Sequence, residues 1–167
     1  ASTSPAGYDA VPYDSMPFAQ THPDRLATLA TVFGMDPPPV LNESFRMLEL
    51  GCACGDNLIP LAMQHPRAEF YGIDFSPRQV EMAHQAIAAM GVGNVRIESM
   101  DILDFPETGE GFDYIVAHGV YSWVPANVRD RLMAICRSRL KPNGVAYVSY
   151  NVFPGWQMQR VVRDVLL

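Results

Sequence analysis

Five short apolar runs alternate with helix-like segments along most of this chain of 167 residues. Each run has the length of a buried strand and stops at glycine, polar or turn-forming residues. The runs lie at 47–50, 69–73, 95–98, 112–117 and 145–150. Strands that alternate with helices form a parallel sheet with helices on both faces, and right-handed crossovers favour a doubly wound, Rossmann-like arrangement. The chain is therefore predicted to have an α/β fold.

The segments between these runs carry the signals of helices, and the clearest covers residues 77–90. Ser76 is the expected cap, Pro77 occupies the first turn and Gly91 follows the end. The expected inner face of this helix comprises Val80, Ala83, Ala86, Ile87 and Met90. Further helices are expected at 57–65, 125–140 and 154–167, and the Lys-Pro-Asn-Gly sequence at 141–144 is expected to form a turn.

Residues 1–45 are predicted to form an N-terminal arm and capping helix ahead of the main domain, which covers 46–167. The first 22 residues are rich in proline, serine and aromatic residues and have no periodicity, so they are expected to be irregular. A helix is then expected to start near His22 and to end at Gly34. Its expected apolar stripe comprises Leu26, Leu29, Ala30 and Phe33.

Charge and hydropathy argue against two classes of protein. The net charge is −6 and the pI is about 5.1, whereas domains that bind nucleic acid usually present a basic face. No stretch approaches the roughly 20 consecutive apolar residues of a membrane-spanning helix. The three cysteines form an odd number and no secretory signal precedes them, which favours reduced thiols in a cytoplasmic protein.

A metal site is not expected from the sequence. Cys52 and Cys54 would supply half of a zinc site, but structural zinc needs four ligands at recognisable spacing, and the sequence has no second pair. The four histidines, at positions 22, 65, 84 and 118, are scattered along the chain. The two cysteines are therefore interpreted as small residues in a tight loop.

The residues that follow each strand are the candidates for a functional site, because doubly wound sheets bind ligands at the carboxyl ends of their strands. The first run leads into a loop of small residues, 51–57, whose backbone amides can face a ligand. Asp74 follows the second run about 20 residues beyond this loop, where an acidic residue can bind the hydroxyls of a ribose. Asp101 and Ile102, after the third run, are candidates to hold an adenine ring.

The loop after the fourth run combines small residues with His118, Tyr121 and Trp123. At the mouth of a sheet this combination indicates the floor of a reaction site. The alternative interpretation is that Tyr121 and Trp123 are aromatic residues of the core.

Taken together and in order, these motifs resemble those of class I S-adenosylmethionine-dependent methyltransferases. The matching segments are Leu48-Glu49-Leu50-Gly51-x-Ala53-x-Gly55, Gly72-Ile73-Asp74-x-Ser76, Asp101, Phe112-Asp113-Tyr114-Ile115 and Leu140-Lys141-Pro142-Asn143-Gly144. The resemblance covers about residues 46–150, and the order and spacing of the set make it specific. One departure is Ala53, which stands where these enzymes usually have a glycine and is still small. The resemblance implies S-adenosylmethionine as the cofactor and S-adenosylhomocysteine as the product.

Three further motifs resemble a bacterial group of these enzymes that carries a C-terminal methyltransferase regulatory domain. They are Thr21-His22-Pro23-Asp24-Arg25-Leu26-Ala27, His118-Gly119-Val120-Tyr121-Ser122-Trp123-Val124-Pro125 and Tyr150-Asn151-x-x-Pro154-Gly155-Trp156. The rickettsial protein-lysine methyltransferases are similar to this group. The resemblance therefore implies a methyl acceptor that is either a protein lysine or a small molecule.

The resemblance also implies roles for individual residues. The cofactor-binding set comprises Glu49, Gly51, Cys52, Ala53, Gly55, Asn57, Asp74, Phe75, Gln79, Asp101, Ile102, His118 and Gly119. Within this set, Asp74 would bind the ribose and Asp101 the adenine. Tyr13, His22, Tyr121 and Trp123 would face the acceptor, and either His118 or Tyr121 would assist the transfer. A lid over the site is expected from Tyr13, Phe18, Thr21 and His22.

Two other functions remain open. These enzymes usually continue with an antiparallel pair of strands, whereas this chain ends in an expected helix, so the chain is predicted to be a fragment of a longer protein. It would then be a cofactor-binding module that is inactive alone. A nicotinamide-dependent oxidoreductase is the weaker alternative, because Ala53 and Asp56 break the Gly-x-Gly-x-x-Gly pattern of dinucleotide-binding loops.

The last expectation concerns self-association. Without the further strands, the run at 145–150 becomes a sheet edge with unpaired backbone groups. The terminal helix also has an apolar stripe that needs a partner, formed by Val161, Val162, Val165 and Leu166. A homodimer through this edge is therefore expected.

Overall fold

A five-stranded parallel sheet flanked by helices forms the fold, as the sequence predicts. The computed structural model describes residues 16–38, 44–152 and 154–156. The strands are β1 (Arg46–Leu50), β2 (Glu69–Asp74), β3 (Val95–Ser99), β4 (Phe112–Ala117) and β5 (Leu140–Val148). The helices are α2 (Pro23–Val32), α3 (Leu58–Gln64), α4 (Pro77–Met90) and α5 (Ala126–Arg139), with 3-10 turns η1 (Ala19–Thr21) and η2 (Ile102–Asp104).

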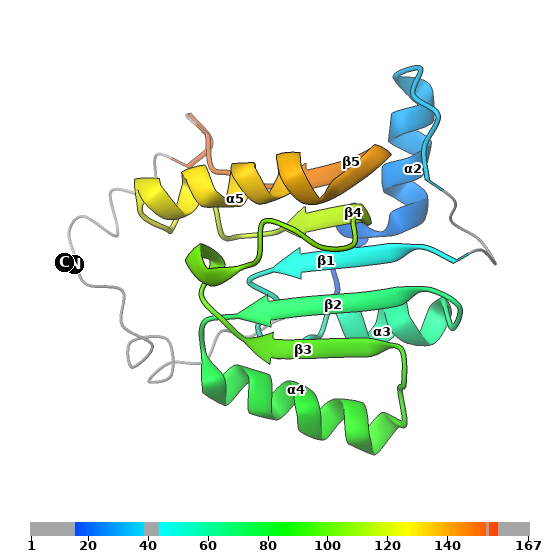
Figure 1. Ribbon diagram of the computed structural model, residues 1–167, viewed down its shortest axis with the longest axis vertical. Coiled ribbons are helices and arrows are strands. Elements are labelled where there is room, and N and C mark those ends of the chain that lie inside the picture. The colour runs from blue at the N-terminus through cyan, green and yellow to red at the C-terminus, as the bar shows by residue number, and fades with distance from the viewer. Residues whose placement is uncertain (1–15, 39–43, 153, 157–167) are drawn as a thin grey trace.

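The strand order is β3-β2-β1-β4-β5, and every pairing is parallel. Figure 1 shows the five arrows pointing the same way, so the loops that follow the strands gather at one edge of the sheet. The chain moves outward from β1 to β2 and β3, and then returns to the other side of β1 to form β4 and β5. The reversal between β1 and β4 is the place where doubly wound sheets bind ligands.

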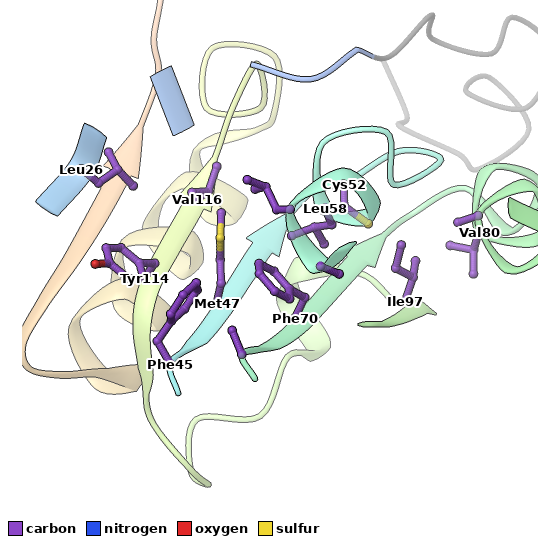
Figure 2. Packing of buried hydrophobic residues seen from close by; sticks show 14 residues of the cluster. Leu26, Phe45, Met47, Cys52, Leu58, Phe70, Val80, Ile97, Tyr114 and Val116 are labelled. Atoms are coloured by element: carbon purple, nitrogen blue, oxygen red, sulfur yellow. The ribbon is translucent and has the colours of Figure 1, made fainter. Parts of the chain in front are cut away.

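Alternating side chains divide the core between the two faces of the sheet. Met47 and Tyr114 belong to the cluster that packs against α2, α3 and α4. Their neighbours Leu48 and Ile115 belong to the cluster that packs against α5. Figure 2 shows the first cluster, in which Leu26 of α2 takes part, so the helix ahead of β1 contributes to the core. Because both faces of the sheet are buried, the strand sequences are continuous apolar runs and do not alternate between apolar and polar residues.

The helix ends follow the predicted signals. The Ser76 hydroxyl accepts a hydrogen bond from the Gln79 N–H at 3.2 Å, and Gly91 closes α4 with a φ of 65°. At the start of α2, His22 Nδ1 accepts a hydrogen bond from the Asp24 N–H at 3.2 Å. Both helices therefore begin with a side chain that satisfies a backbone donor of the first turn.

Two predicted helix faces are wrong at their ends. Met90, in the last turn of α4, is 57% exposed, whereas Ile87, also predicted for this face, packs against the core together with Val92. In the helix ahead of β1, Leu29 is exposed and Phe33 is 81% exposed. Helical spacing identifies the side of a helix that faces the core, but it does not show how far the core extends along the helix.

The predicted turn at 141–144 is instead an irregularity within β5. Phe112 pairs with Leu140, and two residues further along β4 Tyr114 pairs with Val145. The intervening residues of β5 are accommodated as a bulge in which the asparagine adopts a φ of 66°. The strand consequently begins earlier than the predicted 145–150 and ends at residue 148.

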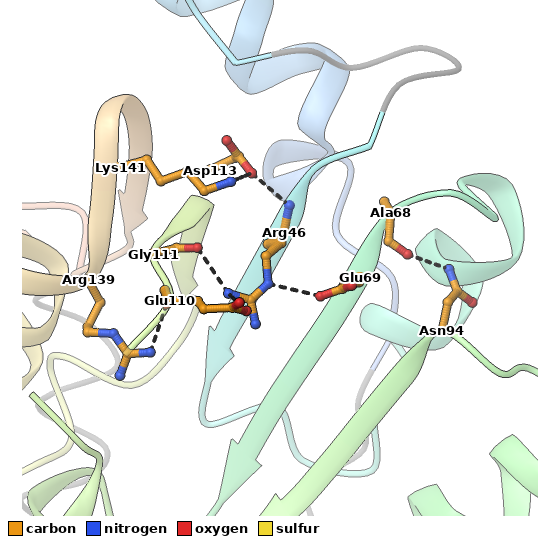
Figure 3. Close-up of polar contacts among 9 residues, drawn as sticks. All are labelled: Arg46, Ala68, Glu69, Asn94, Glu110, Gly111, Asp113, Arg139 and Lys141. Atoms are coloured by element: carbon orange, nitrogen blue, oxygen red, sulfur yellow. Dashed lines mark hydrogen bonds and ion pairs between the residues drawn. The ribbon is translucent and has the colours of Figure 1, made fainter. Parts of the chain in front are cut away.

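Ion pairs fix the amino-terminal edge of the sheet. Asp113 Oδ2 accepts hydrogen bonds from the Arg46 N–H and from Lys141 Nζ, both at 2.8 Å. The Arg46 guanidinium pairs with Glu69 and Glu110, both at 2.9 Å, as Figure 3 shows. A groove lined in part by Arg46 and Glu69 opens at this edge. It lies away from the loops that follow the strands.

The expected helix at 154–167 lies largely outside the described residues, of which 154–156 form a turn. Among the described strands, β5 pairs with β4 alone and is an edge of the sheet. The homodimer expected through this edge stays a prediction, and its second element, the apolar stripe of the terminal helix, lies outside the described residues. No helix of the described part of the chain is long and apolar enough to cross a membrane.

Gly72→Ala is expected to lower the free energy of unfolding by about 1–3 kcal/mol because it overpacks the core. A Cβ at Gly72 would lie 2.7 Å from Cys52 Sγ and 2.7 Å from Leu58 Cδ1. Gly93→Ala is the matched control, because nothing lies within 4 Å of its added Cβ. Urea denaturation of both variants measures the difference. An unchanged midpoint for Gly72→Ala would contradict the close packing of β2 against the loop after β1.

Candidate functional site

The loop after β1 is shaped by residues in the left-handed region of backbone conformation. Gly51, Ala53 and Gly55 have φ values of 76°, 50° and 78°. Glycine adopts this region freely, whereas alanine there costs about 1–2 kcal/mol. Ala53 therefore adopts a conformation that glycine reaches at lower cost. A Cβ on Gly51 would lie 2.5 Å from Val120 Cγ2, so this loop is in close contact with the segment after β4.

Asp74, at the end of β2, reaches across to this loop. Its Oδ2 accepts a hydrogen bond from the Ala53 N–H at 2.8 Å, and its Oδ1 accepts one from the Ser76 N–H at 2.9 Å. Hydrogen bonds from backbone donors to a carboxylate are strong ones and orient it closely. Asp74 thus fixes the loop after β1 relative to the start of α4, at the edge where ligands bind in such sheets.

A buried chain of hydrogen bonds joins β1 to the segment ahead of α2. Asn57 Nδ2 donates to both carboxylate oxygens of Glu49, at 3.1 and 3.2 Å. Asn57 Oδ1 accepts a hydrogen bond from the Phe18 N–H at 3.0 Å and lies 3.1 Å from the Thr21 hydroxyl. The segment around Phe18 and Thr21 is thereby held beside the loop after β1, as expected for these two residues.

Glu49 is an ionisable group held in the interior of the protein. Its side chain is 3% exposed, and this burial raises the pKa of Glu49 from its ordinary 4.5 to about 7. The Asn57 hydrogen bond acts in the opposite direction, and the nearby Asp74 carboxylate raises the pKa further. Carboxyl groups that titrate near neutral pH are typical of functional sites. A cation beside Glu49 would favour its ionised form.

The residues assigned to the adenine lie after β2 and β3. Asp101 caps η2 by accepting a hydrogen bond from the Leu103 N–H at 2.9 Å, and Ile102 is buried behind it. Phe75 is half-buried after β2.

Gln79 is buried in the first turn of α4, and its Oε1 has no hydrogen-bond partner among the described residues. A buried acceptor without a partner is unfavourable, so a ligand that supplied a donor there would be stabilised.

His118, directly after β4, is surrounded by aromatic rings. Its ring centroid lies 3.9 Å from that of Phe18 and 5.9 Å from that of Tyr147. Burial lowers the pKa of His118 below its ordinary 6.5, and its Nδ1 is buried with no partner in the described part of the chain. The Gly119 N–H donates to Ser149 Oγ at 2.8 Å, and a Cβ on Gly119 would meet only open space. A neutral imidazole therefore stands beside an open position.

The loop after β4 and the segment after β5 each contribute two aromatic side chains that contact each other, and we call these four side chains the aromatic face. They form two ring pairs, with centroids 6.3 Å apart for Tyr121 and Tyr150 and 5.7 Å apart for Trp123 and Trp156. The Arg129 guanidinium lies 5.9 Å from the Tyr121 ring centroid. The alternative that these residues belong to the core is wrong for Trp123, which is exposed, but Tyr121 is partly buried and packs against the core cluster that faces α5.

His22 is a predicted site residue that the structure does not bring to these loops. His22 Nε2 lies 3.2 Å from Gln64 Oε1, and its ring centroid is 5.7 Å from that of His65. Within the described ranges, His22 makes no hydrogen bond or ring contact with the loops after β1 or β4. Tyr13 lies outside the described residues.

No site residue was predicted in the last part of β5 or directly after it, although residues 150–156 carry one of the motifs that resemble the bacterial group. Tyr147 contacts His118, Ser149 accepts from Gly119, and the Asn151 N–H donates to Ser122 Oγ at 2.7 Å. The rule that directed attention to the carboxyl ends of the strands applies to the fifth run as well. Applied there, it would have identified this segment.

Comparison with known proteins identifies the family of this arrangement. A model of the methyltransferase domain matches residues 47–144. The structure of PKMT2 from Rickettsia typhi in complex with AdoHcy superposes with a TM-score of 0.86 and 40% sequence identity. The superposition covers 92% of this chain and 29% of that chain.

Curated relatives extend the comparison. An uncharacterized protein of Rickettsia prowazekii (strain Madrid E) is 48% identical over 160 residues, which are 96% of this chain and 29% of the relative. Trans-aconitate 2-methyltransferase of Deinococcus radiodurans is 30% identical over 103 residues, which are 62% of this chain and 36% of that enzyme. The chain thus spans about a third or less of the length of these proteins.

Glu49→Gln is expected to raise the free energy of unfolding by about 1–3 kcal/mol near pH 8 and to change it little near pH 4. The pKa of Glu49 is about 7 in the folded chain, above its ordinary 4.5, so the folded state keeps a proton that the unfolded state loses. Loss of this proton lowers the free energy of unfolding of the parent chain. The lowering is absent below a pH of about 4.5, grows as the pH rises and is complete above about 7.

Urea denaturation at both pH values measures this difference, with Glu81→Gln on the exposed side of α4 as the control. The control is expected to show no pH-dependent gain. A gain from Glu49→Gln that is equal at both pH values would contradict the buried, partly protonated state of Glu49.

Proposed function

The chain belongs to the methyltransferase domain family, whose members use S-adenosylmethionine, and we propose that it methylates the side-chain amine of protein lysines. Two observations support a lysine acceptor. The chain is 40% identical to PKMT2 of Rickettsia typhi, and its motifs around His22, His118 and Tyr150 resemble those of a bacterial group to which the rickettsial protein-lysine methyltransferases are similar. A small-molecule acceptor is the competing proposal, because a trans-aconitate methyltransferase is also a relative.

The residues along the carboxyl edge of the sheet fit the cofactor. When bound, S-adenosylmethionine supplies an electrophilic methyl group on a sulfonium. Asp74 would accept hydrogen bonds from the ribose hydroxyls, and Asp101 and Ile102 would hold the adenine. Glu49 would face the ammonium group of the methionine part, which favours the ionised carboxylate. The buried Gln79 Oε1, which has no partner in the described part of the chain, is a further acceptor for a polar ligand.

The aromatic face and His118 suit an amine acceptor. A lysine ammonium is attracted to aromatic rings, and its transfer out of water lowers its pKa toward the neutral form that can react. We assign to His118 and Tyr121 the orientation of this amine by hydrogen bonds. The amine nitrogen then forms a bond to the methyl carbon as the carbon–sulfur bond breaks, and the methylated ammonium afterwards loses a proton to solvent. Exclusion of water and alignment of the nucleophile are the protein's main contributions.

The single observation that carries the proposal is the position of His118. Its neutral ring contacts Phe18, which the Asn57 hydrogen bond ties to the loop after β1. The same short segment leads directly to Tyr121 and Trp123 of the aromatic face. A cofactor along the strand ends and an amine against the aromatic rings would therefore meet at this residue.

Asp74→Ala is expected to weaken the binding of S-adenosylhomocysteine by about 1–3 kcal/mol, a loss of roughly tenfold to a hundredfold in affinity. The variant removes the carboxylate that would bind the ribose hydroxyls. Isothermal titration calorimetry measures the affinity, and Asp130→Ala on the exposed side of α5 is the control. Thermal unfolding confirms that the variant is folded, since Asp74 also holds Ala53 and Ser76. Equal affinity of the folded variant and the parent would contradict this placement of the cofactor.

Methyl transfer to protein lysines is expected when the chain is incubated with S-adenosylmethionine and a lysine-rich protein, and chemical acetylation of the lysines should abolish it. Mass spectrometry locates the added methyl groups. Trp123→Ala is expected to slow transfer by about tenfold or more, because it removes a surface that aligns the amine, while the affinity for S-adenosylhomocysteine stays unchanged. Met133→Ala, an exposed apolar change on α5, is the control. Transfer to small carboxylic acids without transfer to lysines would contradict the proposed acceptor.

A further inference from the structure

We propose that His22, Asp24 and His65 form a binding site for a divalent transition-metal ion, with zinc as the expected occupant. Each residue offers one ligand atom, and these atoms all lie within 4.8 Å of one another. The site lies between the start of α2 and the end of α3, apart from the loops assigned to the cofactor. It is independent of the proposed function.

His65 provides the strongest sign that a ligand belongs here. Its side chain is 7% exposed, and its Nε2 is buried with no hydrogen-bond partner among the described residues. Asp24 Oδ1, in the same group, is also buried and has no partner in the described part of the chain. A buried nitrogen and a buried carboxylate oxygen without partners are unfavourable in a protein interior, and one cation would satisfy both.

Hydrogen bonds fix the orientation and tautomer of His22. Gln64 Oε1 can only accept a hydrogen bond, so His22 Nε2, 3.2 Å away, carries the proton. The lone pair is then on Nδ1, which accepts the Asp24 N–H at 3.2 Å and lies 3.7 Å from Asp24 Oδ2, so an ion bound to Nδ1 would replace this helix-capping hydrogen bond. Histidines that bind metals usually donate their second ring N–H to an oxygen in this way, which fixes the ring and its tautomer.

The three metal-binding atoms, two imidazole nitrogens and one carboxylate oxygen, determine which class of ion fits the site. Two imidazoles and one carboxylate suit zinc and related transition metals, and three protein ligands leave a fourth position for water. Zinc ligands lie about 2.0–2.2 Å from the ion, so donor atoms in a tetrahedral site stand roughly 3.3–3.5 Å apart. The donor atoms lie within 4.8 Å of one another, so they must approach by up to about 1.5 Å to reach this geometry. Magnesium and calcium prefer oxygen ligands and fit the set poorly.

Metal binding would strengthen the attachment of the N-terminal segment. The site joins α2 to α3 directly after Thr21, which lies 3.1 Å from Asn57 Oδ1 in the buried chain that includes Glu49. An ion bound only by the folded chain would stabilise it by an amount that grows with the logarithm of the ion concentration once the concentration exceeds Kd.

The test uses the chain freed of metal with a chelator and then titrated with zinc chloride by calorimetry. We expect one ion per chain and a rise in the midpoint of thermal unfolding. Cobalt chloride is the spectroscopic probe, because a tetrahedral cobalt site absorbs visible light more strongly than the hydrated ion. Asp24→Asn and His22→Gln should each lower the zinc affinity by about a hundredfold or more, and Gln64→Ala by roughly tenfold.

Two matched controls define the site. His84→Gln should bind zinc like the parent, because His84 Nε2 is engaged with the Ile97 carbonyl at 2.8 Å. Cys54→Ser should also bind normally, since burial and the neighbouring Asp56 raise the pKa of Cys54 to about 11 and keep the thiol protonated. Circular dichroism checks that the variants are folded. Asp24→Asn changes a half-exposed position, so we expect it to disturb folding less than the other variants do.

Several results would overturn the proposal. Absence of zinc binding by the folded parent chain would do so, as would undiminished binding by folded Asp24→Asn and His22→Gln. Loss of binding in Cys54→Ser would assign the ion to the thiols instead. Magnesium chloride that binds as tightly as zinc would show that the donor chemistry is not that of two imidazoles.

Discussion

The buried pair of Glu49 and Asn57 is the interaction on which the rest of the site depends. An ionisable carboxyl group in the interior of a sheet is costly unless its oxygens are satisfied, and Asn57 donates to both of them. The carbonyl of the same amide is in turn held by Phe18 and lies beside the Thr21 hydroxyl. Because each member satisfies the next, loss of one leaves another buried polar group unpaired. The segment ahead of α2, the central strand and the loop after it therefore behave as one unit.

The two edges of the sheet hold different kinds of polar contact. At the amino-terminal edge, Arg46 and Asp113 are engaged in hydrogen bonds and ion pairs (Figure 3). At the carboxyl edge, Ala53 adopts a left-handed conformation, and Gln79 and His118 each bury a polar atom that has no partner among the described residues. Arg139, beside the amino-terminal edge, also buries an atom that has no partner among the described residues, so such atoms are not confined to the carboxyl edge. The carboxyl edge is distinguished by the reversal of strand order, where doubly wound sheets bind ligands.

Local sequence signals predicted most of the fold and part of the site. The bounds of α4 and β4 were predicted as the structure has them, because caps and uninterrupted apolar runs are determined by neighbouring residues. The bulge in β5 was not, since a Lys-Pro-Asn-Gly sequence has the same local preferences in a turn and in a bulge, and pairing with β4 decides between them. The proximity of His22 and His65 was missed for a related reason. Residues far apart in sequence meet through the packing of α2 and α3, which no local pattern records.

The packing of Gly72 against Cys52 has a consequence for how this protein can vary. The Cys52 thiol occupies the space that a side chain at position 72 would need, so the two positions share one small volume. Neither can enlarge unless the other shrinks or β2 moves away from the loop after β1. In an alignment of relatives, the sizes of the residues at these two positions are therefore expected to co-vary, with any larger residue at 72 accompanied by glycine or alanine at 52. The residue that relatives carry at position 52 of the loop would then depend on the residue at position 72 of β2.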